Sequence, residues 1–365
     1  MKIAVFHNFL DNIGGAEIVA LTLARELGAD LYTTNISENK IKQMGFGEIL
    51  PKIKSIGWLP KNAPFRQQLA LWHFRRLNLG KQYDFYIIAG DWAISGTVNN
   101  HPNLWYIFSP LNELWQFKNY IRQELLNWWK RPIFDIWVWF NRKLSQKYGK
   151  SVDCWTCISE NVKNRVKKFY NRVAKVIYPP TDLSQYSFKE SGNFWLSVNR
   201  LTRHKRIELQ IKAFAKLPNE KLIIVGSYES GARQFESYRG YLEKIKPKNV
   251  EILNWVDNSQ LISLYSQCKG FITTAKDEDF GMTVVEAMAS GKPVIAPNEG
   301  GYAETVTKEV GILIDEINED KITEAVKKIN RSPLLYREAC EKRAQIFSTD
   351  NFIAKIKQLL KSYEK

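Results

Sequence analysis

The order of apolar and polar positions divides the first half of the chain into short buried segments and longer amphipathic ones. Unbroken apolar runs are typical of strands buried on both faces of a parallel sheet. Short segments rich in apolar residues lie at 2–8, 29–35, 85–90, 104–108 and 154–159. Segments 16–27 and 160–170 have helical spacing, with Gly28 placed to end the first and Ser159 to cap the second. This alternation predicts an α/β domain with a parallel sheet.

The segment VIYPPTD at 176–182 interrupts this pattern, because two consecutive prolines stiffen the backbone and prevent a helix. We place a domain junction here. A second α/β series follows, with strands expected at 194–200, 221–226, 250–256, 270–275 and 293–297, and helices at 208–217, 259–268 and near 282–290. Open parallel sheets bind ligands beyond the carboxyl ends of their strands.

The length supports two domains, because 365 residues exceed what one hydrophobic core usually organises. We expect Rossmann-like domains at 1–180 and 181–345, with their sheets facing across a cleft. A last helix within 346–365 is expected to pack back on the first domain. The sequence has no run of apolar residues long enough to span a membrane, and its start reads as a strand rather than a signal peptide. A cytoplasmic location is the expectation.

The four cysteines do not form a metal-binding pattern. Cys154 and Cys157 make a CxxC, but no second pair accompanies it, and the four histidines are scattered. An offset of three residues within a strand points the two side chains to opposite faces. We therefore expect reduced thiols and no zinc.

The net charge of +15 is concentrated in the first half, where residues 1–185 hold 25 Lys and Arg against 14 Asp and Glu. The segment 114–150 mixes basic residues with tryptophans, namely Trp115, Trp128, Trp129, Trp137 and Trp139, and 52–81 is a weaker copy of it. This composition suits an anionic membrane surface, and ordinary helix packing with a solvated basic face is the alternative. No nucleic-acid-binding motif accompanies the charge, so nucleic acid is not expected as a partner.

The segment KDEDFGMTVVEAMASG at 276–291 carries the most specific chemistry. Glu278 precedes the predicted helix, Phe280 and Gly281 open it, and Gly291 is placed to end it. The backbone amides at a helix N-terminus suit a diphosphate, and a glycine permits close approach of the backbone. Glu286 lies among apolar residues, where a carboxylate is costly without a polar partner. A sugar or ribose hydroxyl would be such a partner.

Two further segments suggest contacts to phosphate. In SVNRLTRHKRIELQ, Arg200 and Lys205 follow a strand and could neutralise the charge of a diphosphate leaving group. Arg203 and Arg206 are interpreted as ordinary surface charges. Gly14 and Gly15 form a turn after the first strand, but no dinucleotide fingerprint is present there.

Together these motifs resemble the retaining family 4 glycosyltransferases. The shared pattern is E-x-F-G-x-x-x-x-E-A-M-A-x-G-x-P-V-I-A followed by Gly300, Gly301 and Glu304, with SEN at 159–161, VIYPPTD, VG at 225–226 and NWV at 254–256. The resemblance implies the GT-B fold. Within the family, the chain is most similar to mannosyltransferases of cell-surface polysaccharide or lipopolysaccharide synthesis.

The resemblance also implies roles for individual residues. Glu278 would contact the donor sugar and Glu286 the nucleotide ribose, while Arg200 and Lys205 would stabilise the diphosphate. The donor would also contact a set of mainly backbone positions, namely Gly14, Gly15, Phe280, Gly281, Met282, Thr283 and Val256.

The acceptor side departs from the family pattern. Related sequences often have a His where this chain has Phe108, and a basic residue where it has Asn112. Asp91, Ser109 and Glu113 are candidates for the acceptor side.

The predicted reaction moves a hexose, mannose from GDP-mannose, to a glycan or lipid-linked hydroxyl with retention and without metal or other cofactor. Three alternatives stay open: a UDP-sugar donor, another GT-B activity such as a phosphorylase or epimerase, and a catalytically impaired nucleotide-sugar-binding subunit. Asp277, Glu278 and Asp279 also spell the DxD metal motif of another glycosyltransferase fold, but the following FG and second Glu argue against that interpretation.

Overall fold

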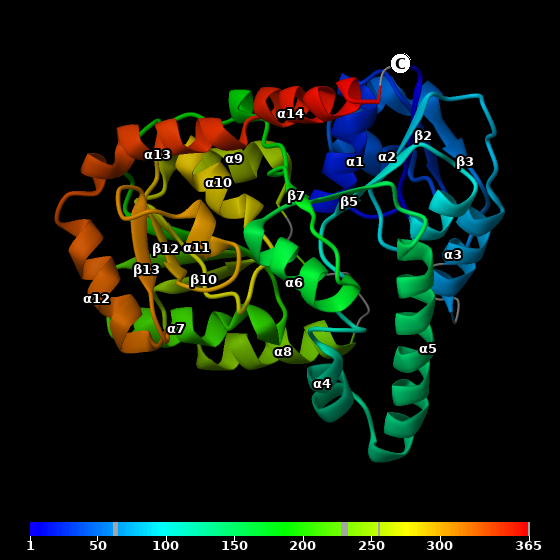
Figure 1. Cartoon of the computed structure of the whole chain (residues 1–365). Coiled ribbons are helices and arrows are strands. Elements are labelled where there is room, and N and C mark those ends of the chain that lie inside the picture. The colour runs from blue at the N-terminus through cyan, green and yellow to red at the C-terminus, as the bar shows by residue number, and fades with distance from the viewer. Residues whose placement is uncertain (61–64, 228–232, 255, 364–365) are drawn as a thin grey trace. The chain divides into compact units, whose positions relative to one another are not determined.

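The chain folds into two compact units, each with its own parallel sheet (Figure 1). A computed structural model describes residues 1–60, 65–227, 233–254 and 256–363. Unit 1 comprises Met1–Pro180 with Phe352–Lys365, and unit 2 comprises Thr181–Asn351. The C-terminal boundary expected after residue 345 is too early. The backbone amide of Thr181 donates to Phe347 O at 2.9 Å and that of Thr349 to Thr181 O at 3.2 Å, which keeps this segment in unit 2.

Unit 1 contains a seven-stranded sheet in the order β3-β2-β1-β4-β5-β6-β7, and all its registered pairs are parallel. The strands are β1 (Ile3–Phe6), β2 (Asp30–Thr33), β3 (Ile53–Ser55), β4 (Phe85–Ile88), β5 (Asn103–Ile107), β6 (Cys154–Cys157) and β7 (Lys175–Val176). The central strands β1, β4 and β5 are buried along their whole length. This burial explains why they appear in the sequence as unbroken apolar runs.

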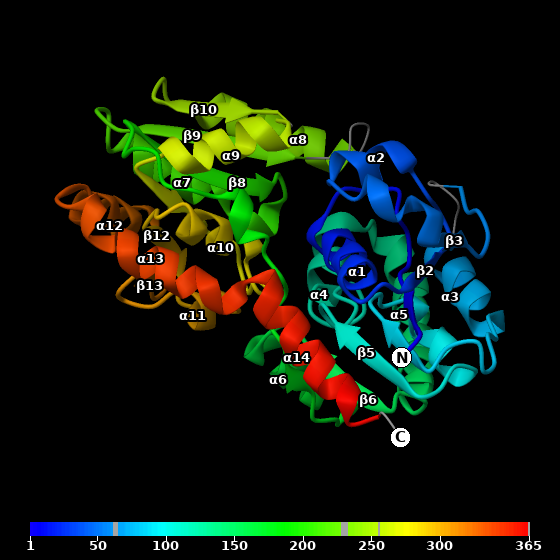
Figure 2. The ribbon, with the colours of Figure 1, turned by 90° about the horizontal axis from the view of Figure 1, so that it is seen from above.

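The helices of unit 1 are α1 (Gly15–Glu26), α2 (Glu38–Gln43), α3 (Arg66–Arg76), α4 (Lys118–Tyr120), α5 (Arg131–Gly149), α6 (Glu160–Tyr170) and α14 (Thr349–Lys361). Ser159 caps α6 by accepting from the Val162 amide at 3.0 Å, as predicted. The last helix, α14, returns to unit 1 (Figure 2). Its Phe352 ring packs edge-on against Tyr106, and Tyr363 beyond it packs against Phe85.

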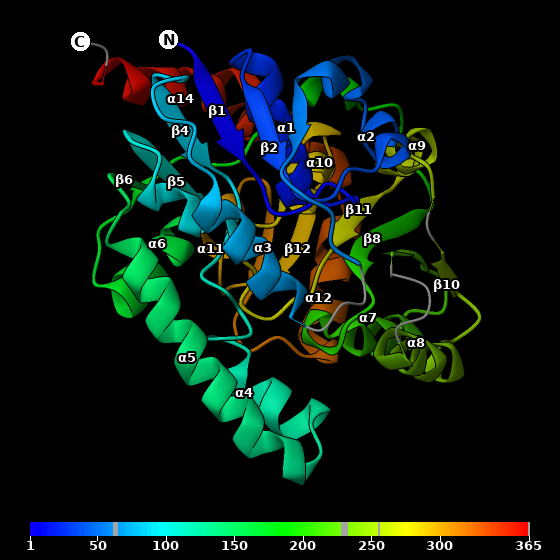
Figure 3. The same cartoon turned by 90° about the vertical axis from the view of Figure 1, so that its right-hand side faces the viewer.

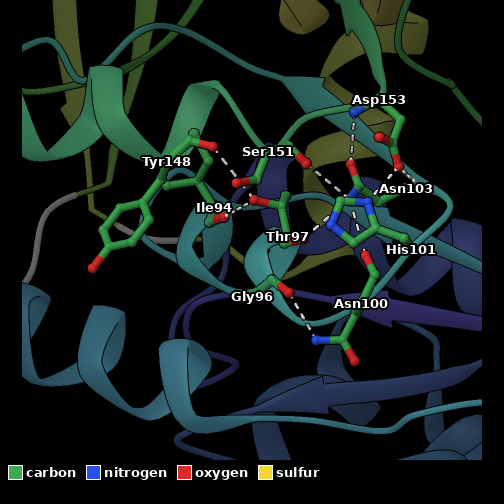
Figure 4. Close-up of polar contacts among 9 residues, drawn as sticks. All are labelled: Ile94, Gly96, Thr97, Asn100, His101, Asn103, Tyr148, Ser151 and Asp153. Carbon is green, nitrogen blue, oxygen red and sulfur yellow. Dashed lines mark hydrogen bonds and ion pairs between the residues drawn. The ribbon is translucent and has the colours of Figure 1, made fainter.

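A buried asparagine joins the loops at the amino ends of β5 and β6 (Figure 4). The Asn103 side-chain amide donates to the carbonyls of Thr97, Asn100 and Ser151 at 3.3, 2.9 and 3.1 Å, and its oxygen accepts from the Asp153 amide at 3.0 Å. One side chain therefore satisfies several buried backbone groups that the turns leave without partners.

Unit 2 contains a six-stranded sheet in the order β10-β9-β8-β11-β12-β13, again with parallel pairs throughout. Its strands are β8 (Phe194–Arg200), β9 (Lys221–Ser227), β10 (Val250–Leu253), β11 (Gly270–Ile272), β12 (Val294–Pro297) and β13 (Gly311–Ile314). Its helices are α7 (Ile207–Ala215), α8 (Arg233–Ile245), α9 (Asn258–Gln267), α10 (Met282–Ala289), α11 (Tyr302–Thr305), α12 (Glu319–Asn330) and α13 (Arg337–Ala344).

In each unit the strand order reverses at one place, between β1 and β4 in unit 1 and between β8 and β11 in unit 2. At such switch points the loops leave neighbouring strands in opposite directions and open a crevice at the carboxyl edge. The sites in both units are built from these loops. In the part of the chain that the structure describes, no helix is long and apolar enough to cross a membrane.

Candidate active site

The predicted catalytic residues come together on two loops at the switch point of unit 2. β8 ends at Arg200 and is followed by a short 3₁₀ helix, Arg203–Lys205, while β11 ends at Ile272 and leads through Glu278 to α10. The Lys205 ammonium lies 2.5 Å from a carboxylate oxygen of Glu278, and both side chains are largely buried. The structure thus joins two residues 73 positions apart in the sequence.

Arg206 organises these two loops, and its interpretation as an ordinary surface charge is wrong. Its guanidinium donates to the carbonyls of Thr274 and Ala275 at 2.7 and 3.2 Å and forms an ion pair with Glu299. The Thr274 hydroxyl in turn donates to the carbonyls of Lys205 and Arg206. The planar, five-donor geometry of arginine suits this bridging of backbone and carboxylate. No local pattern indicates this role, because the partners of Arg206 lie in distant segments.

Two glycines fix the path of the loop that carries Glu278. The Gly301 amide donates to the Glu278 carbonyl at 2.7 Å. A Cβ on Gly300 would lie 2.5 Å from the Glu278 carbonyl oxygen, and one on Gly301 would lie 2.5 Å from the Cα of Phe280. Gly300 also has a φ of +60°. The glycine pair is therefore required for backbone-to-backbone packing beneath the candidate site.

The N-terminus of α10 is available for an anion. Gly281, its N-cap, has a φ of +93° and makes no side-chain capping hydrogen bond. The Phe280 side chain is buried and packs edge-on against Phe347, so only the backbone of Phe280 can face a ligand. Met282 and Thr283 are half-buried in the first turn. Backbone amides and the helix dipole favour a phosphate at such a position.

Glu286 lies on α10 and is held by a residue that the sequence reasoning missed. The phenolic hydroxyl of Tyr265, on α9, donates to a Glu286 carboxylate oxygen at 2.7 Å. Burial raises the pKa of Glu286, and the hydrogen bond from Tyr265 opposes that rise. A carboxylate accepts up to about four hydrogen bonds, so capacity for a ligand hydroxyl remains. No signal in the sequence paired Tyr265 with Glu286.

The remaining predicted residues of unit 2 lie at the same edge of the sheet. Arg200 ends β8 with an exposed side chain, and half-buried Val256 follows β10. Trp255, within the NWV motif, lies outside the described residues. His204 lies between the two predicted cations, and burial, with a smaller contribution from Lys205, lowers its pKa to about 4. The imidazole is therefore neutral at neutral pH.

In unit 1, the predicted residues lie at the carboxyl edge of the sheet, near its switch point. Gly14 is the N-cap of α1 and Gly15 its first residue, while Asp91 follows β4. Asn8, which the sequence reasoning did not single out, accepts from the amides of Trp92 and Ala93 at 3.0 and 2.9 Å. It thus ties the end of β1 to the loop that contains Asp91.

The segment after β5 shows how the departures from the family pattern are accommodated. The buried Ser109 hydroxyl donates to Asn112 at 3.0 Å and accepts from Arg165 at 3.1 Å. Phe108 packs edge-on against Tyr106. Burial raises the pKa of Glu113. Ser109 and Asn112 therefore hold each other and Arg165 in place, and the acceptor roles of Asp91, Ser109 and Glu113 stay predictions.

No arrangement of three or more His, Cys, Asp or Glu side chains within the described ranges could hold a metal ion. This holds also for the acidic run at Asp277–Asp279, although Asp277 has a φ of +49° that turns the loop sharply. The cysteines, including the pair in β6, are free thiols.

The second unit is similar to a known protein family. Residues 180–347, nearly the whole of unit 2, match the family described as Glycosyl transferases group 1. The two Rossmann-like units give the chain the GT-B fold, and unit 2 is similar to the group 1 glycosyl transferases.

Among particular proteins, the chain is similar to alpha-1,3/1,6-mannosyltransferases named ALG2. It is 27% identical to that of Rhizomucor pusillus over 190 residues, which are 40% of this chain and 42% of the relative. It is 25% identical to that of Candida glabrata over 366 residues, which cover 84% of this chain and 78% of the relative. The first of these alignments thus spans less than half of the relative's length.

The fold is similar to that of Anabaena HepE, solved in complex with UDP and glucose. The two structures superpose with a TM-score of 0.74 at 17% sequence identity, covering 99% of this chain and 100% of the other. At this level of sequence identity, the similarity is evidence for the fold alone.

Proposed function

We propose that the chain transfers a hexose from a nucleoside diphosphate sugar to the hydroxyl of a glycan or lipid-linked acceptor, with retention at the anomeric carbon and without a metal. The observation that carries this proposal is the Lys205–Glu278 pair beside the N-terminus of α10, at the switch point of unit 2. A cation, a carboxylate and the backbone amides at a helix N-terminus suit a diphosphate sugar.

Each group has a chemical task in this proposal. Arg200, Lys205 and the first amides of α10 stabilise the negative charge that develops on the leaving diphosphate. Glu278 accepts hydrogen bonds from the sugar and Glu286 from the ribose. Because Lys205 already bonds to Glu278, the ammonium bridges the sugar-binding carboxylate and the diphosphate. The departing phosphate helps to remove the acceptor's proton, so the protein contributes orientation and electrostatics rather than a covalent step.

Mannose from GDP-mannose is the donor we propose, since the relative that aligns over 84% of this chain is named a mannosyltransferase. A UDP-sugar is the second candidate, supported by the UDP complexes of the structurally similar Anabaena protein. Phe108, in place of the usual His, supports a third candidate, a nucleotide-sugar-binding subunit with impaired transfer.

A donor screen separates these candidates. GDP-, UDP- and ADP-sugars are incubated with the chain, with and without EDTA, and nucleoside diphosphate release is measured. Release of GDP that EDTA does not change would support the proposal. Release of UDP would instead favour a UDP-sugar as the donor. Binding of a donor without release would favour the impaired subunit. Loss of release in EDTA would refute the metal-free mechanism, and the anomeric configuration of the product, measured by NMR, tests retention.

The site assignment has its own test. Lys205→Ala should lower kcat by about 100- to 1,000-fold, the usual cost of removing one group that stabilises transition-state charge. Lys216→Ala is the matched control, because Lys216 forms a similar pair with Asp320 at 2.6 Å on the surface of the same unit. Equal rates for Lys205→Ala and the control would show that the catalytic site lies elsewhere.

A further inference from the structure

A helical hairpin at 118–149 projects from the sheet of unit 1 (Figures 1 and 3). Its first arm contains α4 and a π-helical turn, Ile121–Leu125, and its second arm is α5. Between them lies a 3₁₀ turn, Trp128–Lys130, which forms the tip. We call this segment the hairpin.

The polarity of α5 is inverted relative to an ordinary surface helix. Its buried positions include polar or small residues, namely Asn141, Ser145 and Gly149. Its exposed positions are instead large and apolar, namely Ile133 (64% exposed), Ile136 (68%), Trp139 (62%) and Phe140 (54%). At 3.6 residues per turn these four share one face. Burial within unit 1 therefore does not explain why these positions are apolar.

The apolar face belongs to a helix that is held firmly in place. Asp135 forms ion pairs with Lys118 and Arg122 of the first arm at 2.9 and 2.8 Å. At the base, the Arg142 guanidinium donates to the Leu114 carbonyl at 2.8 Å and lies over the Trp115 ring. On the packed side, the Ser145 hydroxyl bonds to Tyr170 at 2.6 Å. The exposure is thus a property of the ordered fold.

The tip extends the apolar surface. Trp128 is 79% exposed and Trp129 53% exposed, and Leu125 beside them is also exposed. The Lys130 ammonium lies 4.9 Å from the centre of the Trp129 ring. Tryptophan with an adjacent lysine is typical of the interface between lipid headgroups and acyl chains.

The charge of this segment selects an anionic partner. Residues 114–150 contain eight Lys and Arg but only two acidic residues, and one of these, Asp135, is already paired with two cations. Lys143 and Lys147 continue the exposed face of α5 one and two turns beyond Phe140. A second copy of the chain would bring the same positive charge to this face, which disfavours self-association.

We propose that the hairpin binds an anionic membrane surface, with Trp128, Trp129 and the apolar face of α5 entering the headgroup layer and Lys143 and Lys147 contacting lipid phosphates. The depth is that of an interfacial helix, about 5–10 Å. Membrane binding by the hairpin is independent of the reaction proposed above. It supplies a way for the enzyme to meet an acceptor that is anchored in lipid.

Vesicle flotation tests this proposal with the full chain. The protein should bind vesicles that contain phosphatidylglycerol much more strongly than pure phosphatidylcholine vesicles, and high salt should weaken the difference. The triple variant Ile133→Ser/Ile136→Ser/Trp139→Ser should lower the partition coefficient at least about tenfold. Lys143→Gln/Lys147→Gln should lower it about 10- to 30-fold at low salt.

A double variant provides the matched control. Val173→Ser/Leu335→Ser removes two equally exposed apolar side chains outside the hairpin and should leave vesicle binding unchanged. Circular dichroism checks that all variants are folded. Unchanged binding of the triple variant, or an equal loss in the control, overturns the proposal. The proposal is also overturned if the wild-type chain does not bind vesicles but forms a dimer that the triple variant abolishes. Binding of the wild-type chain to RNA in preference to anionic vesicles would overturn it as well.

Discussion

The Tyr265 hydroxyl donates a hydrogen bond of 2.7 Å to the Glu286 carboxylate, and so joins α9 to the helix whose N-terminus we assign to the diphosphate. Tyr265 is fully buried, and a second ring, Tyr186, packs edge-on against it with 5.8 Å between centroids. The hydrogen bond therefore fixes the orientation of the carboxylate that we propose for the ribose. Tyr265 acts as a positioning residue for Glu286.

Tyr265→Phe should raise the KM for the donor by about 10- to 150-fold with little change in kcat, because a hydrogen bond to a charged group contributes about 1.5–3 kcal/mol. It should also alter the pH profile. The hydrogen bond lowers the pKa of Glu286 against the effect of burial, so its loss raises that pKa further. The ionised form is then lost at a higher pH, and the acid limb of kcat/KM moves upward.

Tyr241→Phe is the control, because Tyr241 lies on α8 and is exposed. It should change neither KM nor the acid limb. If Tyr265→Phe lowered stability but left both quantities as in the wild type, Tyr265 would be only a core residue.

Arg206→Ala should lower the free energy of unfolding by about 2–4 kcal/mol, since it leaves two backbone carbonyls and the Glu299 carboxylate without their cation. Arg206→Lys should recover little, because lysine lacks the planar fork. Arg203→Ala, at an exposed position of the same loop, should stay within about 0.5 kcal/mol of the wild type. Urea denaturation measures the free energy of unfolding of all three variants. Equal values for Arg206→Ala and Arg203→Ala would show that Arg206 is an ordinary surface charge.

Gly300→Ala should reduce activity and lower stability by about 1–3 kcal/mol, because the new Cβ meets the backbone of Glu278 at a positive φ. Gly240→Ala is a matched substitution in α8, where nothing lies within 4 Å of the added carbon. It should instead stabilise the chain by up to about 1 kcal/mol. Thermal unfolding and donor turnover compare the two, and a Gly300→Ala variant with wild-type turnover would contradict the assigned packing.

Lys292 should make stability rise with pH in alkaline solution. Its side chain is buried over the Phe188 ring, and burial lowers its pKa from 10.5 to about 8. Between these values the unfolded chain binds more protons, so the free energy of unfolding increases with pH, by about 1.4 kcal/mol per unit at most. Denaturant curves across this interval should show the rise in the wild type and in Lys276→Met, an exposed control, but not in Lys292→Met.

Most of the fold could be predicted, because buried parallel strands leave unbroken apolar runs. The less regular elements could not. β3 and β7 are short edge strands with exposed residues, and α3 lies in a stretch whose sequence is notable only for its basic and aromatic composition. β13 and α12 were also not among the predicted elements.

In the candidate site, too, residues with a local sequence pattern could be predicted and residues that depend on distant contacts could not. Glu278, Lys205 and Gly281 could be found because their chemistry is local to a strand end or a helix start. Tyr265 could not, since its role depends on the packing of α9 against α10. Arg206 was misjudged for the same reason, because its role depends on carbonyls some 70 positions away.

The two ends of unit 2 lie next to each other, which makes the unit a contiguous module. Thr181 and Ser348 pair in parallel, and the Phe347 ring beside them packs against Phe280, in the loop between β11 and α10. The polypeptide therefore enters and leaves unit 2 at one place, next to the loop that carries Glu278. Residues 181–351 are therefore one contiguous segment that contains the whole six-stranded sheet, so a chimaera joined at these two ends would leave the loop that carries Glu278 intact.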